Sequence, residues 1–124
     1  MASWFGTCGA LLGAIGVAFG AFGAHGLKDK VEPRMLEIWS KATEYQLWHA
    51  LALLAVFFWM TRADEPSMAA HVAGWSFFIG TLIFSGSLFI LVLSGKTWLG
   101  AITPIGGTAL IVGWVAFAMA LAPS

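Results

Sequence analysis

Charged residues are scarce in this chain of 124 residues: only 10% are Asp, Glu, Lys or Arg, while 60% are hydrophobic. Soluble domains are nearer a quarter charged, so water cannot be the solvent for most of this surface. Six basic residues balance six acidic ones, and the zero net charge provides no basic field for nucleic acid. We therefore expect a protein whose main partner is the lipid bilayer and which does not bind nucleic acid.

Cysteine is almost absent as well, since Cys8 is the only one in the chain. A single thiol excludes an internal disulfide, and in an apolar helix it is expected to serve packing. Acidic residues and lysine are missing from the interior of the apolar segments, which argues against the coupling-ion carboxylate of a transporter. No phosphate-binding loop, catalytic nucleophile with its base or metal-binding cysteine pattern is present. The sequence therefore predicts neither catalytic residues nor a metal site, and it favours a protein that is not an enzyme.

Four apolar segments can cross a bilayer as α-helices, because the hydrocarbon layer is about 30 Å thick and needs roughly 20 helical residues. Clusters of charged residues separate these segments. We predict an all-α integral membrane protein, with a single four-transmembrane-helix bundle over residues 1–124. The four predicted spans are residues 4–27, 45–60, 71–93 and 98–122. In the last of them, Thr103 and Pro104 are typical of a helix start, so residues 98–102 can form a separate short segment.

The second helix is predicted to begin well before its apolar part. Pro33 suits the first turn of a helix, and the charged residues after it recur at spacings of three and four. They form one charged stripe that consists of Arg34, Glu37, Lys41 and Glu44. We therefore expect one long helix over residues 33–60, whose first turns extend into the inner membrane interface.

Basic residues are distributed unevenly among the three connections between the spans. With four spans, the first and third connections share a side, and they carry every basic residue except Arg62. The positive-inside rule then places that side in the cytoplasm and both termini on the non-cytoplasmic side. Tryptophans near the span ends agree with this orientation, because aromatic rings gather at both interfaces. Trp39, Trp48 and Trp98 belong to the inner set, and Trp4, Trp59 and Trp75 belong to the outer set.

Glycines in the first span recur at spacings of three and four, which keeps them on one side of a helix. Each costs about 1 kcal/mol in a helix relative to alanine, so we expect a gain from close approach of another helix in lipid. Small residues in the last span repeat the pattern. The predicted packing seam contains Gly6, Gly9, Gly13, Gly16, Gly20 and Gly23 in the first span, with Gly106 and Gly113 in the last. The spacing leaves open whether the seam meets a helix of the same chain or of another.

Four polar side chains gather toward the inner ends of the first two spans: His25, Tyr45, Gln46 and His49. Tyr45 and Gln46 lie four and three residues before His49, hence on adjoining ridges of one helix. Imidazole, phenol and amide groups together could recognise a quinone or a lipid headgroup, or ligate haem iron. We favour the alternative that these groups hydrogen-bond between helices, so we expect no cofactor and keep quinone and haem as alternatives.

The third span carries hydroxyl groups instead of ionisable ones. They belong to Thr81, Ser85 and Ser87. Hydroxyls in membrane helices commonly bond to a carbonyl one turn back in the same helix. We therefore expect these three residues to bond within their own helix.

Several stretches of the chain resemble the motifs of one family. They are GAFGAHGL at residues 20–27, YQLWHALAL at 45–53, FSGSL at 84–88, and ITPIGG at 102–107 with Gly113 and Trp114. These stretches are similar to the YgdD-like family of small membrane proteins, catalogued as domain of unknown function 423, which has relatives in eukaryotes. The resemblance covers nearly the whole chain. It implies four membrane helices in a bacterial inner membrane or a eukaryotic organelle, and it brings no established activity.

The motifs of that family fall on His25, Tyr45, Gln46, His49 and Pro104, so the resemblance implies that these positions matter for folding or for a ligand. We expect a small protein of the bacterial inner membrane that acts as a structural or accessory component. It would pack against itself as a homo-oligomer or against a larger membrane complex. Two alternatives stay open, namely a binding protein for quinone, haem or lipid that uses the polar cluster, and a small channel or transporter.

Overall fold

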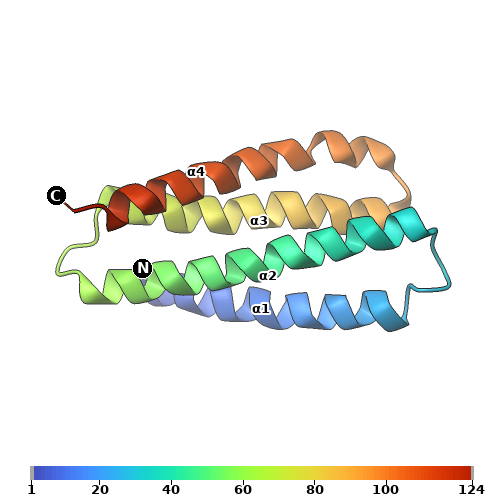
Figure 1. The fold of residues 1–124 in the computed structure, drawn as a ribbon, viewed down its shortest axis with the longest axis horizontal. Helices are drawn as coiled ribbons and strands as arrows, with labels where there is room; N and C mark the ends of the chain where they lie inside the picture. The colour runs from blue at the N-terminus through green and yellow to red at the C-terminus, as the bar shows by residue number, and fades with distance from the viewer. Residues whose placement is uncertain (1, 124) are drawn as a thin grey trace.

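The computed structural model describes residues 2–123 and consists of four long α-helices and one short 3-10 helix (Figure 1). The elements are α1 (Ala2–His25), α2 (Pro33–Arg62), α3 (Met68–Ser94), η1 (Thr97–Ala101) and α4 (Thr103–Leu121). The predicted all-α fold is confirmed. The fourth apolar segment is divided, because η1 precedes the helix that begins at Thr103.

The helix ends follow from local chemistry. Pro33 lies in the first turn of α2, where the missing N–H has no helical partner to lose. Ser67 caps α3 because its Oγ accepts a hydrogen bond from the Ala70 N–H at 3.2 Å. Gly95 ends α3 in the left-handed region at φ 74°, which glycine adopts without a steric cost. The helices therefore end in the charged segments that separate the predicted spans.

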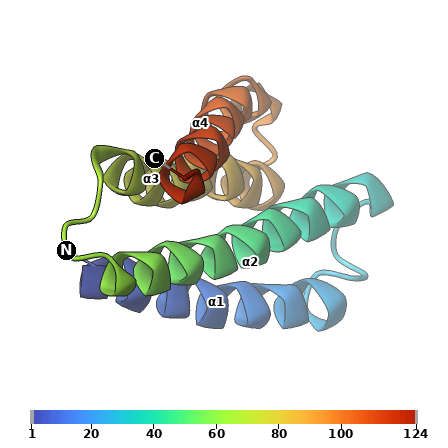
Figure 2. The same cartoon turned by 60° about the vertical axis from the view of Figure 1, so that its left-hand side comes forward.

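The helices run antiparallel in chain order (Figure 1). Most packing is between chain neighbours, since α1 packs on α2, α2 on α3, and α3 on α4, with a smaller contact between α1 and α3. Figure 2 shows the α3–α4 pair lying across the α1–α2 pair at a marked angle. We call the end with the α1–α2 and α3–η1 connections the inner end, because the sequence predicts that it faces the cytoplasm. The first helix begins and the last helix ends at the opposite, outer end (Figure 1).

Three helical segments of residues 2–123 are long and apolar enough to cross a membrane: Ala2–His25, Met68–Ser94 and Thr97–Leu121. In the most apolar stretches of the first and third, 28% of the residues are buried, against 50% in Met68–Ser94. The helix α3 is therefore central, and α1 and α4 turn apolar faces outward. Such faces suit lipid. The helix α2 is not among these three segments, and its first half carries the charged stripe.

The interior contains two groups of buried apolar side chains. The outer group surrounds Phe5, Leu53, Val56 and Phe77, whose exposed fraction is 0%. The inner group surrounds Trp39, whose ring lies 4.6 Å from that of Phe89 between centroids. Both groups lie where α2 and α3 meet their neighbours, which makes these two helices the centre of the fold.

The glycine seam of α1 faces α2. A Cβ placed on Gly6 would lie 2.9 Å from Phe57 Cγ, and one on Gly9 would lie 2.9 Å from Ala50 O. At the inner end, a Cβ on Gly20 would lie 3.2 Å from Thr43 Cγ2. The nearest atoms to Gly13, Gly16 and Gly23 also belong to α2. The seam is therefore occupied within one chain.

The small residues of α4 face α3 instead. A Cβ placed on Gly106 would lie against the backbone of Phe84, and one on Gly113 would lie 2.7 Å from Phe77 Cδ1. In return, a Cβ on Gly80 of α3 would lie 3.0 Å from the backbone N of Leu110. One seam thus packs α1 against α2 and the other packs α4 against α3, so the two seams do not meet each other.

Candidate functional site

The four polar residues predicted as a cluster divide into one exposed residue and three on α2. His25 is exposed at the end of α1, whereas Gln46 and His49 are each 4% exposed. Gly23 packs on Trp39, so His25 lies beside the first turns of α2. Tyr45 lies about 9 Å further along that helix, because six residues at about 1.5 Å each separate it from Trp39. The structure therefore brings Tyr45 and His49 together beside α3 and α4, turns Gln46 toward α1, and leaves His25 apart.

Gln46 connects α2 to the backbone of α1. Its Nε2 donates a hydrogen bond to the Leu12 carbonyl at 2.8 Å in a buried position. That carbonyl lies four residues before Gly16, whose missing side chain leaves the oxygen uncovered on the seam. The amide of Gln46 therefore fixes one helix against the other.

Trp39 repeats this arrangement one heptad earlier on α2. Its indole Nε1 donates to the Phe19 carbonyl at 2.7 Å, and Phe19 lies four residues before Gly23. Sequence reasoning treated Trp39 only as an interfacial ring and missed this bond. The sequence did contain a signal for this bond. The donors Trp39 and Gln46 are seven residues apart on α2, and Gly16 and Gly23 are also seven residues apart on α1.

His49 has both of its ring nitrogens occupied. Trp114 Nε1 donates to His49 Nε2 at 3.0 Å, and His49 Nδ1 lies 2.6 Å from the Tyr45 carbonyl. Because an indole only donates and a carbonyl only accepts, the imidazole is neutral with its proton on Nδ1. Neither nitrogen has a free lone pair for haem iron or a metal ion. The described residues also contain no group of three or more His, Cys, Asp or Glu side chains that could hold a metal.

The hydroxyls of α3 follow three different patterns. Ser87 bonds to the Phe84 carbonyl in its own helix at 3.0 Å, as expected, and its Oγ also lies 2.6 Å from Thr103 Oγ1 at the start of α4. Ser85 instead donates to the Ala42 carbonyl of α2 at 2.6 Å, and Thr81 Oγ1 is buried without a hydrogen-bond partner. Expecting all three to bond within α3 was therefore wrong, since the close approach of α2 offers Ser85 a carbonyl of another helix.

A hollow of about 500 Å³ lies beside this group, between α2, α3 and α4. Its lining includes Tyr45, Trp48, His49, Phe84, Pro104 and Trp114. The ring of Tyr45 stacks on that of Phe84, with centroids 4.4 Å apart and planes 12° apart. The volume falls within the range of small-molecule sites, and the walls are aromatic and apolar. The hollow can therefore accept a flat or aliphatic lipophilic group.

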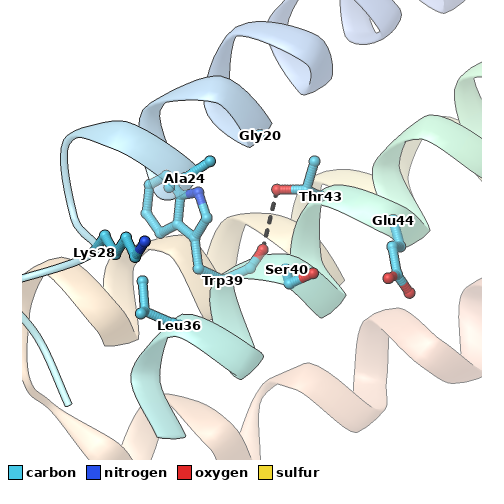
Figure 3. Close-up of a pocket in the computed structure, with 9 residues that line it drawn as sticks. Gly20, Ala24, Lys28, Leu36, Trp39, Ser40, Thr43 and Glu44 are labelled. Carbon is cyan, nitrogen blue, oxygen red and sulfur yellow. Dashed lines mark hydrogen bonds between the residues drawn. The ribbon is translucent and has the colours of Figure 1, made fainter. Parts of the chain in front are cut away.

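A second hollow of about 430 Å³ lies at the inner end, between α1 and α2. Figure 3 shows Lys28 beside Trp39 and Leu36, and Glu44 beyond Thr43. The hydroxyl of Thr43 donates to the Trp39 carbonyl at 3.0 Å, drawn as a dashed line in Figure 3. This hollow joins the charged stripe to the inner end of the glycine seam, a juxtaposition that sequence reasoning did not anticipate.

Replacing Trp114 by phenylalanine is expected to lower the free energy of unfolding by about 1 kcal/mol, because the buried His49 Nε2 loses its donor. Unfolding by SDS in mixed micelles measures this change. The exposed Trp98 provides the control, and Trp98→Phe is expected to change stability by less than about 0.5 kcal/mol. In a double-mutant cycle with His49→Leu, simple additivity would contradict the direct bond.

Comparison with known proteins gives a consistent result. The sequence model of the family described as "Protein of unknown function (DUF423)" matches residues 19–107. A UPF0382 membrane protein of Staphylococcus aureus is 48% identical over 107 residues, which cover 86% of this chain and 85% of the relative. A UPF0382 membrane protein of Staphylococcus epidermidis is 46% identical over 112 residues, covering 90% of this chain and 89% of the relative.

A third relative extends this similarity to another genus. The UPF0382 membrane protein YwdK of Bacillus subtilis is 43% identical over 114 residues, covering 90% of each chain. No solved structure matches this chain. The match of the family model, the names of the relatives and the apolar helices agree that this is a membrane protein, and the chain belongs to the DUF423 family.

Proposed function

We propose that the chain crosses the bacterial inner membrane four times, with both termini on the non-cytoplasmic side. The helices α1 and α3 are each long and apolar enough to span, and they run in the same direction (Figure 1). A chain that crosses twice in one direction must return between the two crossings, and α2 is the helix that connects them. The uneven distribution of basic residues supports the orientation, with the first turns of α2 at the cytoplasmic interface.

Within this membrane the protein acts as a non-enzymatic structural or accessory component. The observation that carries this proposal is the use of the buried polar groups. Gln46 bonds to the backbone of α1, and His49 accepts a hydrogen bond from Trp114 of α4 while its other ring nitrogen bonds within α2. The buried polar side chains of residues 2–123 are hydroxyl, amide and imidazole groups, and none is acidic or a lysine or arginine. These groups support helix packing and give no support to a channel or transporter.

Purification from the native membrane in mild detergent tests this proposal. We expect the protein to elute colourless with a second copy or with another membrane protein in a fixed ratio. Proteoliposomes that contain the purified protein are expected to show no solute flux above the background of empty vesicles. A haem spectrum, or flux that depends on the protein, would contradict the accessory role.

One observation favours a second candidate, the binding of a lipophilic molecule with a flat ring, such as a quinone. The hollow between α2, α3 and α4 is lined by aromatic rings, and the Tyr45 side chain reaches its wall. Aromatic walls favour a planar ring through stacking, and a phenol can donate a hydrogen bond to a quinone carbonyl. His49 would contact the bound molecule only with the face of its ring, because both of its ring nitrogens already make hydrogen bonds.

Filling the hollow tests the second candidate. Gly107 lines it, so Gly107→Phe is expected to lower the affinity for decyl-benzoquinone at least tenfold, measured by quenching of tryptophan fluorescence in micelles. The control is Gly86→Phe, because nothing lies within 4 Å of a Cβ at Gly86. Equal quenching of the wild type and both variants would show that the probe only partitions into the micelle, and would contradict a site in this hollow.

A further inference from the structure

The hollow of about 430 Å³ between α1 and α2, which we call the inner hollow, carries one charge of each sign. Lys28 lies beside Leu36 and Trp39, whereas Glu44 lies beyond Thr43 (Figure 3). Glu44 follows Trp39 by five residues, which is about 7.5 Å along α2. Both charged side chains are exposed. The inner hollow therefore presents a cation at one end and an anion at the other.

The carboxylate of Glu44 lies at a depth where α1 is apolar. Thr43 packs on Gly20, so Glu44 lies level with this part of α1. The helix continues for more than one turn beyond it, to His25, and Val17 on the other side is 64% exposed. A carboxylate at this depth meets hydrocarbon, where a charge is costly unless a cation pairs with it. Glu44 therefore needs a positively charged partner.

Two other charged residues of α2 can pair with each other. Lys41 follows Glu37 by four residues, and a glutamate placed before a lysine at this spacing gives the better order for an ion pair within a helix. Neither of them lines the inner hollow. The ammonium of Lys28 and the carboxylate of Glu44 are therefore the charges that the inner hollow offers to a ligand.

Hydroxyl groups and apolar surface lie between these two charges. The Thr43 hydroxyl donates to the Trp39 carbonyl, so its oxygen can still accept a hydrogen bond. The Ser40 hydroxyl can donate one to an anion. Trp39 offers only its ring, because its Nε1 already donates to the Phe19 carbonyl. The wall formed by α1 consists of small residues, which leaves room for a ligand: Gly20, Gly23 and Ala24.

We propose that the inner hollow binds a phospholipid whose headgroup carries a primary ammonium, as in phosphatidylethanolamine. The phosphate lies against Lys28 and Ser40, the ammonium donates to Glu44 and Thr43, and the acyl chains extend into the surrounding lipid. An anionic headgroup without an amine would leave Glu44 unpaired. A choline headgroup has no N–H to donate to the carboxylate. This inference rests on the topology proposed above, which sets the inner hollow at the cytoplasmic interface.

Native mass spectrometry of the purified protein in detergent tests the inference, because it counts the lipids bound to each molecule. The probes are dioleoyl phosphatidylethanolamine, phosphatidylcholine and phosphatidylglycerol, which share their acyl chains. We expect phosphatidylethanolamine to bind about tenfold more tightly than either of the others, because only this lipid pairs with both charges. Glu44→Gln is expected to remove this preference, and Lys28→Gln to weaken the binding of all three lipids.

Matched variants separate the hollow from the general surface charge. Glu37→Gln and Lys41→Gln make the same changes of charge on exposed residues of α2 outside the hollow, and both are expected to bind the lipids as the wild type does. Ala24→Trp fills the hollow and is expected to lower the affinity for phosphatidylethanolamine about tenfold. Its control is Ala21→Trp, on an exposed residue of the same helix that does not line the hollow.

Equal affinity for the three lipids would overturn the inference. A Glu44→Gln variant that still prefers phosphatidylethanolamine, or an Ala24→Trp variant that binds it normally, would do the same. Because binding is measured in detergent, it does not depend on the orientation of the chain. Labelling of Ala122→Cys in a Cys8→Ser background from each side of the membrane measures that orientation. Termini on the cytoplasmic side, with the lipid affinities as expected, would overturn the topology alone.

Discussion

Replacing Gly106 by alanine is expected to force α4 away from α3 and to lower the free energy of unfolding by about 3 kcal/mol. A Cβ at this position would lie against the backbone N of Phe84 and 2.9 Å from the Gly80 carbonyl oxygen. Backbone atoms of a helix cannot rotate out of the way as a side chain can, so the whole helix must shift. Unfolding by SDS in mixed micelles measures the loss.

The neighbouring glycine provides a matched control in the same helix. A Cβ on Gly107 would have its nearest neighbour, Phe84 Cδ2, at 3.7 Å, which is an ordinary contact. We expect Gly107→Ala to change the free energy of unfolding by less than about 0.5 kcal/mol, with a small gain in helix propensity. Equal losses at both positions would contradict the close approach of the α3 and α4 backbones.

Gly9→Ala is the second substitution with a large expected effect, a loss of about 2 kcal/mol in the free energy of unfolding. The new Cβ would lie 2.9 Å from the Ala50 carbonyl oxygen and 3.1 Å from Leu53 Cβ, both of which move only with α2. The seam position one turn later differs, because a Cβ on Gly13 would have only Ala50 Cβ nearby, at 4.0 Å. Gly13→Ala is expected to be neutral or to stabilise the protein by up to about 1 kcal/mol.

This pair of variants separates two explanations of the glycine seam. If the six glycines simply make α1 flexible, both substitutions should act in the same direction. If the seam allows close contact with α2, they should act in opposite directions or differ by about 2 kcal/mol or more. A Gly13→Ala variant that loses as much stability as Gly9→Ala would contradict the contact with α2, measured by the same SDS unfolding.

The helices could be predicted from the sequence because long apolar runs bounded by charge have few alternatives in a membrane protein. The seam of α1 could be predicted as well, since its glycines recur at helical spacing. The helix that occupies the seam could not, because periodicity identifies a face and leaves its neighbour undetermined. The structure places α2 there, with large residues such as Phe57 and Leu47 opposite the glycines.

The candidate site was less accessible to sequence reasoning. Tyr45, Gln46 and His49 share one part of one helix, so their proximity follows from spacing alone. Gln46, however, bonds to a backbone carbonyl of α1, and a carbonyl is present at every position of the chain. The partner of His49 is Trp114, which lies 65 residues away and meets it only after α4 folds back along α3. Both partners depend on tertiary packing.

The two side-chain bonds that reach α1 from Gln46 and Trp39 restrict how that helix can move. A slide of one residue would carry α1 about 1.5 Å along its axis, and the matching screw motion would turn it by about 100°. Either change would break both bonds together and press bulky side chains into the space that glycine leaves. Sliding or turning α1 relative to α2 therefore requires both bonds to break, so the two bonds favour a single register between the first two helices.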